Sequence, residues 1–114
     1  MLRTLVKTTA LAVDNHEVAV RYFELRTERG ARRYSAEIDL HSFRPEDIPS
    51  VVEEYITAAA LAGLREVRLI HGRGKGVQRG IVQAALDRHP RVAEFCDDTS
   101  SHLGATIARL EGPI

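Results

Sequence analysis

Residues 67–79 read Val-Arg-Leu-Ile-His-Gly-Arg-Gly-Lys-Gly-Val-Gln-Arg, a short strand that leads through a glycine-rich loop into a helix. The strand is β-branched at both ends, and apolar residues recur at helical spacing from Val77 to Arg88, so that these residues, Val77 among them, are expected to face inward. Between them, three glycines at alternate positions allow backbone angles that other residues avoid. The stretch therefore predicts a β-loop-α unit, with the loop at the carboxyl end of a strand.

The flanking sequence extends this unit in both directions. Alternation predicts strands near 17–26 and 34–41, joined by a turn at 28–31, and phase slips at Phe23 and Leu25 suggest a bulge there. A helix is expected from about Pro49 to Gly63, which supplies the C-terminal cap, and short strands are expected at 92–96 and 105–110. The first 13 residues read as a plain N-terminal strand. We predict a compact two-layer α/β sandwich of order β-α-β-α-β-β (residues 36–114), preceded by an N-terminal β-hairpin extension (residues 1–35).

Length and composition narrow the class of protein. At 114 residues the chain forms one domain, and a hydrophobic fraction of 44% is enough for a packed core. Cys96 is alone, which excludes an internal disulfide and fits a reducing cytoplasm. No apolar run approaches the ~18 residues of a membrane span, so we expect no membrane partner.

The charges are unevenly distributed although the formal net charge is zero. Residues 37–54 hold six acids and one base, whereas residues 65–79 hold five bases and one acid. We interpret the molecule as a dipole of two patches, in which a local basic stripe binds phosphate.

The loop His71-Gly72-Arg73-Gly74-Lys75-Gly76 predicts an anion site. It lies before a helix N-terminus, where N–H groups and the helix dipole favour negative charge, and Arg79 follows about one turn later. The spacing fits neither the P-loop nor the dinucleotide fingerprint, so no small-molecule nucleotide is expected. An extended polyanion fits better, because Arg65, Arg68 and Arg79 flank the loop. The alternative is a tight turn with solvated basic side chains.

Asp39, His41 and His71 form a second set of interest. Parallel strands ending at one sheet edge would bring this carboxylate and two imidazoles beside the loop. One histidine would act as general base on water and the other would stabilise charge or protonate the leaving oxygen. Asp39 would orient His41 or help hold a divalent cation such as Mg²⁺. Structural, hydrogen-bonded histidines are the alternative.

Several of these segments together resemble the Smr (small MutS-related) family. Asp39-Leu40-His41, the loop at 71–76 and Gly104-Ala105-Thr106-Ile107 occur in the family's order, among other segments between about residues 36 and 110. The resemblance implies a nucleic-acid-binding module, often an endonuclease on DNA or RNA, that occurs in MutS paralogues and as small stand-alone proteins. It implies a fold like the C-terminal domain of translation initiation factor three. Asp39 and His41 match the motif proposed as catalytic, and residues 71–76 match the motif needed for substrate.

Two positions depart from the family pattern. Ser42 stands where the family usually has glycine, and Ser101-His102 stands where it usually has a glycine pair. Both changes stiffen the backbone next to the expected site. The leading hypothesis is a stand-alone Smr-type endonuclease, and the alternative is a DNA- or RNA-binding module without turnover.

Overall fold

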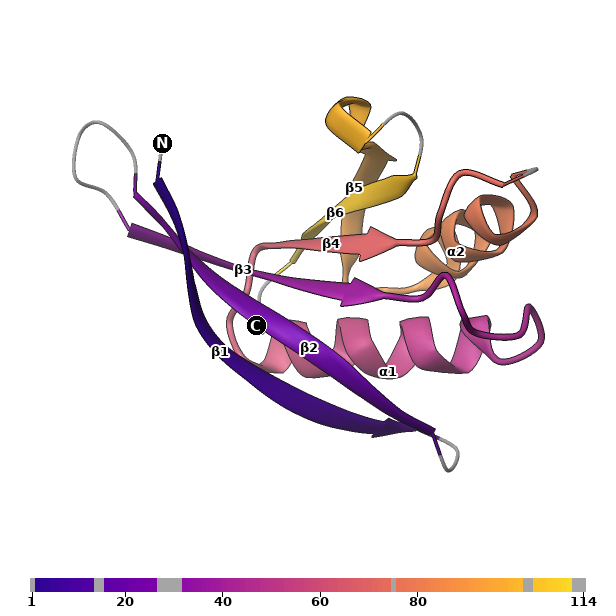
Figure 1. The fold of residues 1–114 in the computed structure, drawn as a ribbon, viewed down its shortest axis with the longest axis horizontal. Coiled ribbons are helices and arrows are strands. Elements are labelled where there is room, and N and C mark those ends of the chain that lie inside the picture. The colour runs from indigo at the N-terminus through magenta and orange to yellow at the C-terminus, as the bar shows by residue number, and fades with distance from the viewer. Residues whose placement is uncertain (1, 14–15, 27–31, 75, 102–103, 112–114) are drawn as a thin grey trace.

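The computed structural model describes residues 2–13, 16–26, 32–74, 76–101 and 104–111. One sheet is covered on one face by two helices, so the predicted two-layer α/β architecture is confirmed (Figure 1). The elements, in chain order, are β1 Leu2–Val13, β2 His16–Arg26, β3 Arg32–Asp39, α1 Ile48–Leu61, β4 Glu66–Ile70, α2 Val77–Arg88, β5 Val92–Asp97, the short 3-10 helix η1 Thr99–Ser101 and β6 Ala105–Leu110.

The sheet order is β1-β2-β3-β4-β6-β5. β3 and β4 are connected by helix α1 and pair directly with each other in parallel, as expected for a β-α-β unit. β6 lies between β4 and β5 and is antiparallel to both, so β4 and β5 also run in the same direction. The last strand of the chain is therefore next to the strand that precedes the glycine loop.

The N-terminal strand β1 pairs with β2, and β2 pairs with β3, both in long antiparallel pairs. The irregularity predicted near Phe23 is present, but the extra residue is Val6 on the neighbouring strand β1. The turn predicted at residues 28–31 lies outside the described residues. The sheet is continuous from β2 to β3, and the division at residue 35 stays a prediction.

Helix α1 ends as the sequence predicts. Gly63 has a φ of 84°, and its N–H donates to the carbonyl of Ala60 while the N–H of Leu64 donates to that of Ala59. This pair of hydrogen bonds is a Schellman motif, which requires the left-handed backbone that glycine adopts without strain. Leu64 is buried beyond the cap, so the turn also fixes where β4 begins.

The core lies between the helices and one face of the sheet. Alternate residues of β3 and β4, such as Ile38 and Leu69, are fully buried there against Val52 and Ile56 of α1. Because β3 and β4 are parallel neighbours, their carboxyl ends meet at one sheet edge. That edge carries both predicted motifs.

Candidate nucleic-acid site

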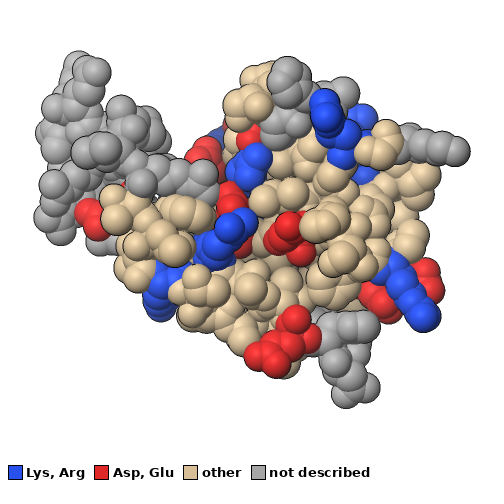
Figure 2. Space-filling model, viewed as in Figure 1, with Lys and Arg blue, Asp and Glu red and all other residues tan. Residues whose placement is uncertain are grey.

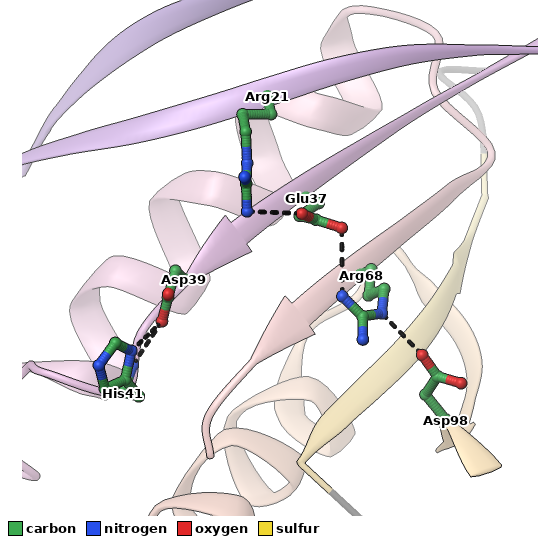
Figure 3. A network of polar contacts seen from close by, with 6 residues as sticks. All are labelled: Arg21, Glu37, Asp39, His41, Arg68 and Asp98. Atoms are coloured by element: carbon green, nitrogen blue, oxygen red, sulfur yellow. Dashed lines mark hydrogen bonds and ion pairs between the residues drawn. The ribbon is translucent and has the colours of Figure 1, made fainter. Parts of the chain in front are cut away.

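Asp39 and His41 form a hydrogen-bonded pair where β3 ends. The strand stops at Asp39, and the buried Leu40 donates its N–H to the carbonyl of Ile70, which ties the ends of β3 and β4 together. The chain then turns, so that Asp39 Oδ1 accepts from both the backbone N–H of His41, at 3.1 Å, and its ring Nδ1, at 2.5 Å (Figure 3). Both side chains are exposed, at 44% and 62%. The sequence predicts the pair on one strand face, whereas the structure forms it through this turn.

Gly72 brings the glycine loop against this pair. Its φ is 82°, and a Cβ at this position would lie 3.4 Å from the Cβ of His41. A side chain here would therefore be strained by the backbone and would also press on His41. The absence of a side chain lets the loop and the imidazole lie side by side.

The start of the loop is anchored to Gly104, the residue that directly precedes β6. The N–H groups of His71 and Gly72 both donate to the carbonyl of Gly104, at 3.1 and 2.9 Å. Beyond this anchor the loop borders a hollow of about 290 Å³, which Val77 and Gln78 also line. The loop is thus fixed at its base and open at its tip.

Helix α2 begins at this hollow with unpaired backbone donors. Gly76 precedes the helix with a φ of 84°, and the N–H of Gly80 is the first to donate back, to the carbonyl of Gly76. The N–H groups of residues 77–79 therefore have no acceptor within the helix. The side chain of Gln78 donates to the carbonyl of Phe43, which ties the helix start to the turn after His41. Such free N–H groups and the helix dipole favour an anion at a helix N-terminus.

The basic residues of this edge differ in their surroundings. Arg73 is exposed and has no charged partner among the described residues, and Lys75 lies outside them. Arg79 makes two 2.7 Å hydrogen bonds to the carboxylate of Asp97. These bonds raise the pKa of Arg79 and lower the pKa of Asp97. Arg73 is thus the described cation best placed to meet a ligand.

His71 occupies a position that does not suit proton transfer to a ligand. Its residue is 2% exposed, its Nδ1 lies 3.0 Å from the carbonyl oxygen of Gly72, and its Nε2 lies 2.9 Å from Thr106 Oγ1. With both ring nitrogens engaged inside the protein, the imidazole orients the loop. The expected acid-base role of His71 therefore lacks the exposure that it needs.

Arg68 lies on the opposite face of the sheet from the helices and is already neutralised. Its guanidinium contacts Glu37 on β3 and Asp98 after β5, and Glu37 also contacts Arg21 on β2 (Figure 3). Partial burial lowers the pKa of Arg68, but its hydrogen bonds with Asp98 and Glu37 outweigh this and raise it. The sequence predicts Arg68 as a phosphate-binding residue in an open basic stripe, whereas the structure pairs its guanidinium with two carboxylates.

The predicted separation of charge into two patches is wrong on this face. β3 and β4 pair with Glu37 opposite Arg68, so the acidic and basic segments of the sequence meet in space. Figure 2 shows acidic and basic side chains interspersed rather than divided into two halves. The sequence could not indicate this, because it depends on the register in which β3 and β4 pair.

Three residues that support the site carry no role in the sequence-based hypothesis: Thr106, Gln83 and Gln78. Gln83 donates to both Thr106 Oγ1 and Asp97 Oδ1, at 3.1 and 2.9 Å, and Thr106 is fully buried. The available signal was a threonine at an inward-facing position of β6, followed two residues later by the buried Ala108. A polar residue on a buried strand face needs a hydrogen-bond partner.

Among the described residues, no three or more His, Cys, Asp or Glu side chains lie close enough together to hold a metal ion. Asp39 and His41 are the exposed pair of a carboxylate and an imidazole described at this edge, and they form a hydrogen bond with each other. Neither helix in the described part of the chain has the length and apolar character of a membrane span.

The family model of the Smr domain matches residues 38–111, which include the Asp39–His41 pair, the glycine loop and β6. The chain belongs to the Smr domain family. The chain is 41% identical over 78 residues to endonuclease MutS2 of Shouchella clausii, and 33% identical over 113 residues to that of Halalkalibacterium halodurans. These matches cover 67% and 96% of this chain, but only 10% and 14% of the relatives.

Solved structures agree with this assignment. The Smr domain of Thermus thermophilus MutS2 superposes with a TM-score of 0.63 and 31% identity, covering 66% of this chain and 96% of that one. YdaL, a stand-alone small MutS-related protein from Escherichia coli, gives a TM-score of 0.61 and 26% identity over 66% of this chain and 63% of its own. The predicted Smr fold is confirmed.

Proposed function

We propose that this Smr domain binds the sugar-phosphate backbone of DNA or RNA at the loop edge and cleaves a phosphodiester bond with Asp39 and His41. The loop edge comprises the glycine loop, residues 71–76, and the first turn of α2, residues 77–79. Two matched relatives are named endonuclease MutS2, and this chain spans about a tenth of their length. The nuclease activity is therefore proposed here for the Smr domain itself.

One observation carries the proposal: the Asp39–His41 pair lies directly against Gly72. A phosphate held by the loop and by the free N–H groups of α2 would lie within reach of the exposed imidazole. Asp39 accepts the Nδ1 proton of His41, which leaves Nε2 with a lone pair. A carboxylate that orients an imidazole in this way prepares it to act as a general base.

The proposed reaction follows from this geometry. His41 Nε2 takes a proton from a water molecule as the water oxygen attacks phosphorus. The P–O ester bond then breaks, and the leaving oxygen gains a proton from solvent. Loop N–H groups and Arg73 stabilise the additional negative charge on the phosphate oxygens in the transition state. Asp39 stabilises the imidazolium and is also the residue that would contribute to a Mg²⁺ site.

A nicking assay tests the proposal. Wild-type protein and the His41→Ala and Asp39→Asn variants are incubated with supercoiled plasmid and with structured RNA, each with and without Mg²⁺. We expect wild-type cleavage and a loss of about 100-fold or more in both variants, since general bases contribute about 10²- to 10⁴-fold. Because both side chains are exposed, the thermal midpoints of the variants should stay close to that of the wild type.

Asp87→Asn is the matched control, because Asp87 is an exposed carboxylate on α2 that lies outside the loop edge. It should cut as well as the wild type. Cleavage by His41→Ala at the wild-type rate would show that the pair is not catalytic.

A binding module without turnover is the second candidate. One observation favours it: His71 is buried, so among the described residues His41 is the exposed imidazole that remains at this edge. In that case both nucleic acids would bind in a salt-sensitive manner and remain intact under every condition. Arg73→Ala would weaken binding under either function.

A further inference from the structure

We propose that Thr106 and Gln83 are positioning residues that act through His71 to hold the backbone N–H of Arg73 toward the bound phosphate. The proposal rests on the proposed function, because it assigns a role within the same phosphate site. It is carried by a chain of hydrogen bonds that runs from α2 through β6 into the glycine loop.

The hydrogen bonds of this chain have only one consistent direction. The carbonyl oxygen of Gly72 can only accept, so His71 Nδ1, 3.0 Å away, must carry the ring proton. Nε2 of a neutral ring then accepts from the hydroxyl of Thr106, at 2.9 Å. Thr106 Oγ1 in turn accepts from the amide of Gln83, at 3.1 Å. Every donor in this chain meets an acceptor.

A protonated ring would break this order. Nε2–H would have to donate to Thr106 Oγ1, and the Thr106 hydroxyl proton would need another acceptor. His71 and Thr106 are 2% and 0% exposed, so neither a charge nor an unpaired hydroxyl is easily hydrated. The hydrogen bonds therefore fit the ring tautomer that carries its proton on Nδ1.

The orientation of the Gly72 carbonyl determines the orientation of the next N–H. All peptide bonds of the described residues are trans, so the C=O of Gly72 and the N–H of Arg73 point in opposite directions. Since the carbonyl points to the buried imidazole, the N–H of Arg73 points away from it, and Arg73 itself lines the hollow.

This N–H is the first donor that the loop can offer. Those of His71 and Gly72 are both used by the carbonyl of Gly104. The N–H of Arg73 therefore adds a donor to the N–H groups of residues 77–79, which have no acceptor within the helix. A loop without the His71 contact would be free to rotate this peptide and lose the donor.

The test combines a spectroscopic and a binding measurement on the full chain. Long-range ¹H–¹⁵N spectra report the protonation of the His71 ring nitrogens, and fluorescence anisotropy reports affinity for labelled DNA and RNA duplexes. Thr106→Val removes the hydroxyl at nearly constant volume, and Thr106→Ser keeps it. Thr57→Val is the matched control, because it breaks a threonine–histidine hydrogen bond to His89, far from the loop.

We expect Nδ1–H in the wild type, a changed His71 signal in Thr106→Val, and an affinity about 5-fold lower, as for the loss of one oriented hydrogen bond. Gln83→Leu should show a smaller loss. Thr106→Ser should restore both readouts, and Thr57→Val should change neither. A rescue by serine separates positioning from general destabilisation.

Three outcomes would overturn the proposal. An Nε2–H ring in the wild type would reverse the direction of the chain. Equal affinity of Thr106→Val and wild type would remove the positioning role while leaving the proposed function intact. If the wild type binds neither duplex, the proposed function fails and the positioning role fails with it.

Discussion

Two regions of this Smr domain carry arginines in different surroundings: the sheet face opposite the helices, here called the open face, and the loop edge. On the open face, Arg21 and Arg68 flank the buried Glu37, and Asp98 completes the row (Figure 3). At the loop edge, Arg73 has no charged partner among the described residues. Arginines on the open face thus stabilise the contacts between strands, whereas Arg73 at the loop edge is available to a ligand. Strand register makes the difference, because it places Glu37 opposite Arg68.

The largest expected effect comes from a pair of glycine substitutions. Gly72→Ala and Gly63→Ala both force alanine into a φ near 84°, so each should lower the free energy of unfolding by about 1–2 kcal/mol. Only Gly72 lies against His41, so the backbone shift that relieves the strain at residue 72 would also move the base, and a misplacement of about 1 Å should reduce cleavage about 100-fold. Chemical denaturation and the nicking assay measure the two effects. Equal loss of cleavage in both variants would show that the contact of Gly72 with His41 has no effect on catalysis beyond that of lost stability.

Glu37→Gln should affect stability and leave binding unchanged. The substitution leaves Arg68 and Arg21 without their shared carboxylate, at a cost of about 1–2 kcal/mol. The cost is below that of a fully buried pair, because Arg21 is half exposed. Urea denaturation measures it, and affinity for nucleic acid should stay at the wild-type value. A fall in affinity with no change in stability would place the open face in the binding site.

Arg73→Ala should weaken nucleic-acid binding by about 3- to 10-fold without changing stability. It removes one phosphate contact, so the slope of log affinity against log salt should fall by about one. Arg88→Ala, at the far end of helix α2 from the loop, is the control and should bind as the wild type does. If the two variants bind equally, the loop edge is not where phosphate is held.

The smallest effect concerns Asp97, which lies between the two regions. Hydrogen bonds from Arg79 lower its pKa, so its contribution to stability is present above the ordinary aspartate value of about 4 and is lost as pH falls through the lowered value. A ¹³C titration of the carboxylate should show the lowered pKa in the wild type and a return toward the ordinary value in Arg79→Ala. An ordinary pKa in the wild type would mean that the contact with Arg79 does not persist in solution.

Most of the fold could be predicted because it depends on local patterns. The helix at 77–88 and the strand at 105–110 match the sequence-based bounds, and Gly63 caps α1 as expected. Apolar periodicity and capping glycines act over a few residues, so they can be read directly. One local inference is wrong: Val77 is expected to face inward but is 59% exposed, because it lies where the loop enters the helix.

The candidate site was harder to predict where it depends on distant partners. The meeting of residues 39–41 with the loop followed from two parallel strands ending together. The burial of His71 did not, because it requires Thr106 of β6 to lie beside β4. Likewise, the pairing of Arg68 with Asp98 joins residues 30 positions apart. Spacing along a chain does not encode such contacts.

The position of β6 between β4 and β5 also governs when the site can form. The loop is made at residues 71–76, but its anchor and the partner of His71 belong to residues 104–106. During synthesis the loop therefore exists as sequence some thirty residues before the strand that completes it, and β6 must insert between two strands that precede it in the chain. Phosphate binding as proposed would then require β6 to be in place, so that a chain ending before residue 104 would be unable to engage nucleic acid.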